Sequence, residues 1–169
     1  MGSEMCIRDR LATMRELTLF FAPNINSYKR YVEGSFAPTA VAWGLDNRTC
    51  ALRIVGHGPS LRVENRVPGG DVNPYLAVAA CLAAGLYGIE RGLTLEQPAT
   101  QGSAYLDDSV ERLPRNLQIA TQKLADSKTA REILGDDFVS HYVATREWEW
   151  RQFQDAVTDW ETARYFEII

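Results

Sequence analysis

An uncharged, largely apolar run from Tyr75 to Ile89 constrains the fold more than any other feature of the sequence. At 15 residues it is shorter than the roughly 20 apolar residues that a membrane-spanning helix needs. Asn73 and Pro74 precede it, and these residue types favour the N-cap and the first turn of a helix. The sequence therefore predicts a helix from Pro74 to about Arg91 that is apolar on all sides and buried in a protein core.

Three short runs before this helix have the composition of β-strands: residues 39–45, 50–55 and 61–67. Glycine and proline separate the last two at hairpin-like spacing, so an antiparallel pair is the simplest arrangement. Helical patterns cover residues 11–21, 115–125, 127–134 and 138–157, and Thr158 with Glu161 has the form of a capping box for one last short helix. These patterns predict an α+β fold in which helices surround an antiparallel sheet.

Length, charge and cysteine content exclude several classes of protein. The 169 residues suffice for one packed domain, and the net charge of −4 argues against a dedicated binder of nucleic acid or anionic membranes. The cysteines lack metal-binding spacing. Cys50 and Cys81 are expected to be reduced and inert, which suits a cytoplasmic protein.

The first ten residues, MGSEMCIRDR, resemble the translation of a transposase adapter used in preparing sequencing libraries. We therefore expect residues 1–10 to be an adapter-derived artefact. Residues 11–169 are then expected to belong to a longer natural protein that continues upstream of Leu11.

The third predicted strand carries alternating charges. A period of two places Arg62, Glu64 and Arg66 on one face. A carboxylate between two guanidinium groups stays ionised well below neutral pH, and arginines bind phosphate or carboxylate oxygens in bidentate fashion. The alternative is a solvated strand face stabilised by charge pairs between strands, and the spacing alone favours this alternative.

Three segments resemble the C-terminal half of the catalytic domain in the glutamine synthetase superfamily: NSYKR at 26–30, DNRTCALRI at 46–54 and RVENRVPGGDVNPYLAVAACLAAGL at 62–86. The similarity covers nearly all of residues 11–169. It implies a curved antiparallel sheet with surrounding helices, in a chain that lacks the N-terminal domain and the first part of the catalytic domain. It also implies a homo-oligomeric ring with active sites between neighbouring subunits.

The resemblance further implies a reaction in which ATP converts the γ-carboxylate of glutamate into an acyl phosphate, which an amine then attacks. Matched to the family motifs, Arg30 and Arg66 lie at the glutamate. Arg48 is catalytic, because its counterpart stabilises phosphoryl transfer, and Arg48, Arg53 and Arg62 bind the nucleotide. Glu64 matches a ligand of Mg²⁺ or Mn²⁺. These roles agree with phosphoryl-transfer chemistry, which depends on positive charge around the phosphate oxygens.

Phe36 differs from the ammonia-using members of the family. They carry a glutamate six residues after the arginine of the NSYKR motif, where it helps to form the ammonium site and takes a proton. A phenyl ring cannot accept a proton, so Phe36 favours a bulkier, partly apolar amine. The segments WGLDNRT and VTDWETARYFEII also resemble the γ-glutamylpolyamine synthetase branch of glutamate–amine ligases.

The sequence therefore predicts a cytoplasmic ATP-dependent ligase of nitrogen and polyamine metabolism, which joins glutamate to a polyamine or an alkylamine. Two alternatives remain open. One is an ammonia-using glutamine synthetase, and the other is a non-catalytic relative with a structural or regulatory role. The retained arginines argue against the second alternative, because a site without catalysis has no physical need for them.

Overall fold

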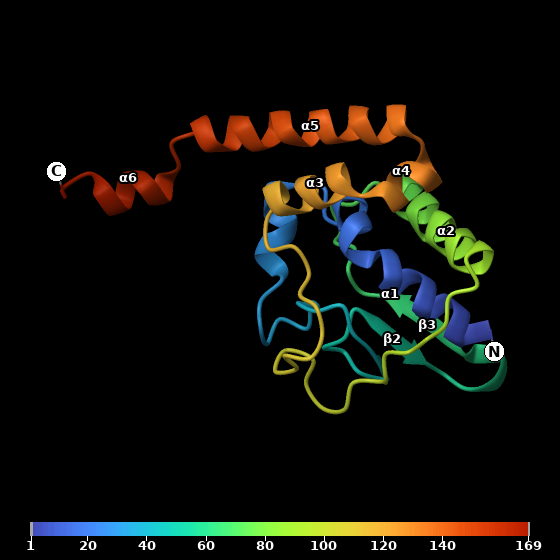
Figure 1. Ribbon diagram of the computed structural model, residues 1–169. Helices are drawn as coiled ribbons and strands as arrows, with labels where there is room; N and C mark the ends of the chain where they lie inside the picture. Colours follow the sequence, from blue (N-terminus) through green and yellow to red (C-terminus); the bar gives the residue numbers. More distant parts are fainter. Residues whose placement is uncertain (1, 169) are drawn as a thin grey trace.

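The computed structural model describes residues 2–168. Its elements, in chain order, are α1 (Gly2–Phe21), the 3-10 helix η1 (Ile25–Arg30), β1 (Trp43–Leu45), β2 (Leu52–Val55), η2 (Gly58–Ser60), β3 (Arg62–Asn65), α2 (Pro74–Glu90), α3 (Leu117–Asp126), α4 (Lys128–Leu134), α5 (Asp136–Asp155) and α6 (Asp159–Tyr165). The strands lie on one side of α1, and α3 and α5 lie on the other (Figure 1). The predicted α+β class is confirmed.

The sheet has the order β1–β2–β3. β2 and β3 are antiparallel, as predicted, whereas β1 runs parallel to β2, with Trp43 opposite Leu52. The segment between β1 and β2 explains the difference. Asp46 has a φ of 46°, and the Asn47 side chain accepts hydrogen bonds from the backbone and hydroxyl of Thr49. The chain therefore folds back and enters β2 in the direction of β1.

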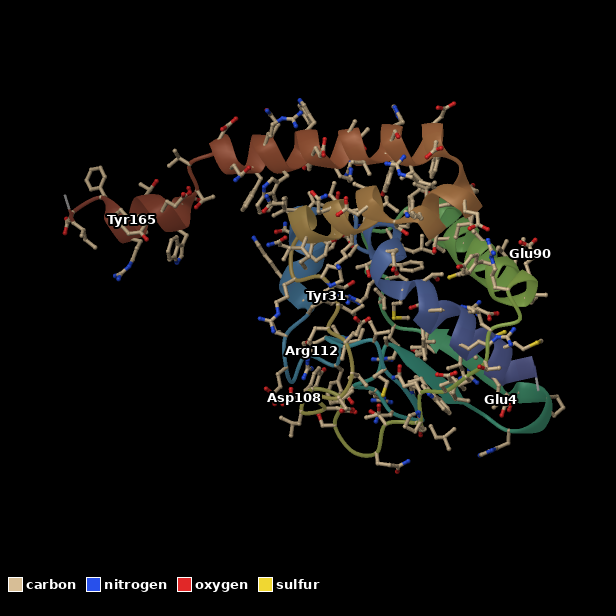
Figure 2. The ribbon with its side chains drawn as sticks, in the orientation of Figure 1. Glu4, Tyr31, Glu90, Asp108, Arg112 and Tyr165 are labelled. Carbon is tan, nitrogen blue, oxygen red and sulfur yellow. The ribbon has the colours of Figure 1, made fainter. Side chains whose placement is uncertain are left out.

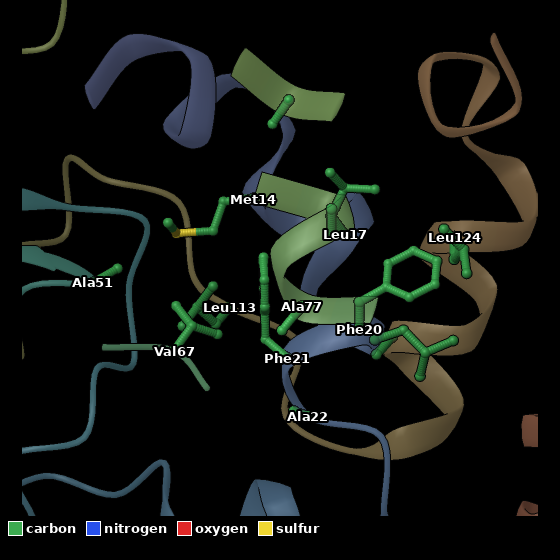
Figure 3. Close-up of a cluster of buried hydrophobic side chains, with 14 of the residues drawn as sticks. Met14, Leu17, Phe20, Phe21, Ala22, Ala51, Val67, Ala77, Leu113 and Leu124 are labelled. Atoms are coloured by element: carbon green, nitrogen blue, oxygen red, sulfur yellow. The ribbon is translucent and has the colours of Figure 1, made fainter. Parts of the chain in front are cut away.

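The core lies between α1, α2, α3 and the sheet (Figure 3). Buried side chains of α1 supply its centre, among them Met14, Leu17 and Phe20. This helix ends at Phe21, as the pattern over residues 11–21 predicted, and it extends upstream to Gly2. The side chain of Asp9 fills the space where Gly88 of α2 would otherwise carry a Cβ. The assignment of residues 1–10 to an adapter stays a prediction.

Helix α2 begins as predicted, because the Asn73 side chain accepts hydrogen bonds from the backbone of Tyr75 (3.0 Å) and Leu76 (3.3 Å). Its small residues face the core: Ala77, Ala80, Ala84 and Gly88. The prediction that the helix is buried on all sides is wrong for the opposite face. Five large apolar side chains there are exposed by 58–85% and form what we call the α2 stripe: Tyr75, Val78, Leu82, Leu86 and Ile89.

The C-terminal part of the chain extends away from the body. Only the first half of α5 contributes buried residues, Val139 and Val143, and α6 lies beyond the far end of α5 (Figure 1). Helix α6 begins at the predicted capping box of Thr158 and Glu161. Within residues 2–168, no helix is both long and apolar enough to cross a membrane.

Candidate functional site

Glu64 lies at the centre of a charged cluster on the sheet. One carboxylate oxygen accepts a hydrogen bond from Arg53 Nη1 at 3.1 Å, and the other accepts one from Arg66 Nη1 at 2.9 Å. The expectation of two guanidinium groups around Glu64 holds, but one partner differs. Arg53 stands directly opposite Glu64 in the β2–β3 register, whereas Arg62 donates to the Ser60 carbonyl at 3.3 Å.

Asp46 completes this cluster, and the sequence interpretation missed it. Arg53 Nε donates to the Asp46 carboxylate at 2.9 Å, so Arg53 bridges two acidic side chains. The signal in the sequence is an aspartate directly after the first strand. The hydrogen bond and the charge of Arg53 lower the pKa of Asp46. Partial burial acts to raise the pKa of Glu64, but the hydrogen bonds and charges of Arg53 and Arg66 outweigh it, and the pKa is lowered.

Arg66 connects this cluster to the segment from Tyr31 to Ala37, which we call the Phe36 loop. Arg66 Nη2 donates to the Phe36 carbonyl oxygen at 2.9 Å. The Ser35 hydroxyl lies 2.8 Å from the Arg30 carbonyl and holds the loop in a turn. Phe36 has a φ of 56°, a conformation that costs free energy for a bulky side chain, and the residue is 56% exposed.

Arg30 fixes the chain after β3. Its guanidinium group donates to the carbonyl oxygens of Arg66 (2.9 Å), Val67 (3.1 Å) and Pro68 (3.1 Å). Arg30 thus lies next to Arg66, as the motif comparison implied, but much of its donor capacity serves the backbone. Arg48 is exposed in the segment after β1, where its charge helps to lower the pKa of Asp46.

The structure therefore brings five of the seven predicted site residues together through direct bonds: Arg30, Phe36, Arg53, Glu64 and Arg66. Arg62 begins β3, the strand of Glu64, and Arg48 lies in the segment after β1; neither has a bond to Glu64 among the described residues. Hydrogen bonds to backbone carbonyl oxygens hold the guanidinium groups of Arg30 and Arg66 in place. Guanidinium groups held in this way suit binding of an anionic group such as a phosphate or a carboxylate.

A cavity of about 340 Å³ borders the Phe36 loop. Tyr31 and Glu33 line it from the loop, and Asp108 and Arg112 line it from the segment before α3 (Figure 2). The Tyr105 hydroxyl donates to the Ala37 carbonyl at 3.0 Å and so ties this segment to the loop. The cavity is polar, and its wall carries basic as well as acidic groups, with Arg112 paired to Asp108 at 2.8 Å.

The described residues do not form a divalent-metal site by themselves. Both acidic groups of the cluster, Asp46 and Glu64, are bonded to arginine. Between residues 2 and 168, no group of three His, Cys, Asp or Glu side chains is arranged to hold a metal ion. Mg²⁺ and Mn²⁺ require several oxygen ligands, so Glu64 supplies one carboxylate at most.

Residues 7–165 match the family model described as "Glutamine synthetase, catalytic domain". The chain belongs to the glutamine synthetase family. Enzymes of this family use ATP and divalent metal ions in general. The glutamine synthetase match covers residues 7–10 in addition to the segment where the motifs were found.

Among relatives in the glutamine synthetase family, the chain is 56% identical over 158 residues to γ-glutamylethanolamide synthetase GlnA4 of Streptomyces coelicolor, covering 94% of this chain and 34% of the relative. It is 51% identical to type-1 glutamine synthetase 2 of Dictyostelium discoideum, covering 96% and 32%. It is 42% identical to a glutamate–isopropylamine ligase of a Pseudomonas species, covering 94% and 35%. The chain thus spans about a third of the length of these curated relatives.

The fold agrees with this membership. A solved structure of a GmaS/ADP complex superimposes with a TM-score of 0.84 at 30% identity, covering 98% of this chain and 39% of that one. The glutamine synthetase-type fold predicted from the motifs is therefore confirmed for this portion.

Proposed function

We propose that this chain is part of an ATP-dependent glutamate–amine ligase that forms a γ-glutamyl amide of an alkylamine or polyamine. The observation that carries the proposal is the bond from Arg66 to the Phe36 carbonyl, which brings an apolar residue to the edge of an arginine cluster suited to anions. Relatives named as an ethanolamide synthetase and an isopropylamine ligase support it.

The proposed reaction has two steps. A γ-carboxylate oxygen of glutamate attacks the terminal phosphorus of ATP, an O–P bond forms, and ADP leaves. The amine nitrogen then attacks the γ-carbonyl carbon, a C–N bond forms, and the C–O bond to phosphate breaks. The amine loses a proton to a base or to water, and Phe36 cannot be that base.

The residue roles in this proposal follow the motif matches. Arg66 and Arg30 lie at the glutamate, and Arg48 stabilises charge on the transferred phosphoryl group. The nucleotide phosphates contact Arg48, Arg53 and Arg62. Glu64 contributes one ligand to a metal site whose other ligands lie outside residues 2–168. The magnesium or manganese ion would reduce repulsion between the phosphate oxygens and the attacking carboxylate.

Phe36 is proposed to select against ammonium. A small hydrated cation needs a carboxylate to offset the loss of water, since stripping a charge without a partner costs several kcal/mol. The methylene groups of an alkylamine instead gain roughly 0.8 kcal/mol each when buried. A polyamine carries a second ammonium group, for which Glu33 in the neighbouring cavity is a candidate partner. Asp108 on the same wall is already paired with Arg112 at 2.8 Å.

The test uses the family-length protein that contains this chain. Glutamate-dependent phosphate release is compared for ammonium, methylamine, ethanolamine, isopropylamine, putrescine and spermidine at equal concentration. The proposal predicts that at least one amine has a kcat/KM well above that of ammonium. Ammonium as the best substrate would support an ammonia-using glutamine synthetase, and no turnover with any amine would support a non-catalytic relative.

We further propose that the family-length protein forms a homo-oligomeric ring with active sites between subunits and works in the cytoplasm. The ring rests on the family resemblance, and the compartment rests on the free cysteines Cys50 and Cys81. Mass measurement by light scattering tests the ring, and fractionation of the source cells tests the compartment.

A further inference from the structure

The α2 stripe is an exposed apolar surface that the described fold does not explain. Its residues recur at positions 75, 78, 82, 86 and 89, the spacing of one helix face. No charged residue occurs between Pro74 and Ile89, so this face lacks the polar side chains of a solvated helix. The five side chains are adjacent to one another, and contiguous apolar surfaces of this kind mark contact sites.

The structure also shows what covers the other face of α2. The small residues Ala77, Ala80 and Ala84 pack into the core, and Figure 1 shows α1 alongside α2. Across the residues that the structure describes, nothing covers the stripe, because Leu82 and Leu86 are exposed by 64% and 61%. One face of α2 is therefore packed against the core, and the opposite face is exposed.

The open edge of the sheet is a second observation. Among the described strands, β3 pairs with β2 alone, so its other edge presents unpaired backbone groups. An unprotected strand edge invites pairing with a further strand. Eight residues, 66–73, separate β3 from α2. A further polypeptide segment that packs on the α2 stripe and pairs with the free edge of β3 would account for both the exposed apolar side chains and the unpaired strand edge.

We infer that the α2 stripe is the docking face for the remaining part of a family-length chain. The length comparisons identify this occupant: the chain covers 34% of GlnA4 and 39% of the GmaS chain while keeping their fold. About two thirds of such a protein is therefore outside this sequence. A helix that is apolar on all sides is typical of a position buried on all sides, and α2 would have that position if the remainder covered the stripe. A helix face that stays in contact with water would instead carry polar side chains.

The test separates this occupant from a second copy of the chain. The part of Streptomyces coelicolor GlnA4 outside the 158 matched residues is produced as a separate polypeptide and co-expressed with residues 1–169. The inference predicts a one-to-one complex by size-exclusion chromatography with light scattering. The double variant L82K/L86K is expected to weaken the affinity between the two polypeptides at least tenfold. The control L106K, at a leucine exposed by 73%, is expected to leave the complex intact.

Circular dichroism of the isolated chain supplies the folding control. Because Leu82 and Leu86 are exposed, L82K/L86K keeps the spectrum and the melting temperature of the unsubstituted chain. The inference is overturned if no one-to-one complex forms, if L82K/L86K leaves that complex intact, or if it instead breaks a homodimer. The readout is binding, so the inference and the proposed ligase activity fail independently.

Discussion

The carboxylate of Glu64 lies between Arg53 and Arg66, and this geometry makes a pH-dependent prediction. The folded-state pKa of Glu64 is below its ordinary value of 4.5, so the ionised carboxylate stabilises the fold. This contribution is complete above about pH 4.5 and is lost as the pH falls through the lowered pKa. Glu64→Gln should therefore lower the melting temperature at pH 7, by about 2–4 °C or less for a partly exposed pair.

Thermal denaturation between pH 7 and pH 3 measures this effect. The difference between Glu64→Gln and the unsubstituted chain should shrink as the pH falls below 4.5. Glu90→Gln, at the exposed end of α2, is the matched control and should show little change. A difference that stays constant down to pH 3 would mean that the arginine bonds to Glu64 contribute nothing to stability.

Phe36 has the φ of a left-handed conformation, 56°, and is an exposed residue. This conformation costs roughly 1–2 kcal/mol for a residue with a Cβ, and glycine avoids the cost. We expect Phe36→Gly to be more stable than Phe36→Ala by about 1 kcal/mol, measured by urea denaturation. Equal stability of the two variants would show that the loop relaxes around position 36. A strained, exposed phenylalanine fits a residue kept for binding.

Helix α2 allows a test of the local signals that predicted it. The Asn73 side chain caps the first turn, and its removal leaves two backbone N–H groups without a partner. Asn73→Ala should lower the free energy of unfolding by about 1 kcal/mol, while Asn73→Ser should retain most of it. Urea denaturation followed by circular dichroism gives both values. An Asn73→Ala variant with the same free energy of unfolding as the unsubstituted chain would show that the Asn73 cap does not stabilise the fold.

At the scale of elements, local signals predicted much of the structure. The Asn73–Pro74 start, the Thr158–Glu161 capping box and the hairpin between β2 and β3 follow from short-range physics. The parallel pairing of β1 and the exposed face of α2 were not predictable in that way. The first depends on how the segment after Leu45 folds back, and the second on which part of a longer protein lies against the helix.

The candidate site was predictable in composition but less so in geometry. The period of two placed Glu64 and Arg66 on one face, and the family motifs selected Arg30 and Arg53. Strand register decided that Arg53, and not Arg62, contacts Glu64, and register is a long-range property. The Asp46–Arg53 bond and the Arg66–Phe36 bond depend on the same three-dimensional placement.

For the whole molecule, the chain alone should be catalytically silent. The described residues offer no complete metal site, and the chain spans about a third of its relatives. Purified residues 1–169 should release no phosphate from ATP with glutamate and any amine above the rate without protein. A sensitive phosphate assay checks this expectation, and the family-length protein is the positive control. Measurable glutamate-dependent turnover by residues 1–169 would contradict it.

The central claim is that Phe36 makes the family-length protein prefer an alkylamine to ammonium. The decisive measurement is the ratio of kcat/KM for ethanolamine to that for ammonium in the unsubstituted protein, Phe36→Leu and Phe36→Glu. We predict a ratio well above one for the first two, because both side chains are apolar. Phe36→Glu should lower the ratio at least tenfold by offering ammonium a carboxylate that offsets its desolvation and accepts its proton. A ratio below one in the unsubstituted protein, or one that Phe36→Glu leaves unchanged, would contradict the claim.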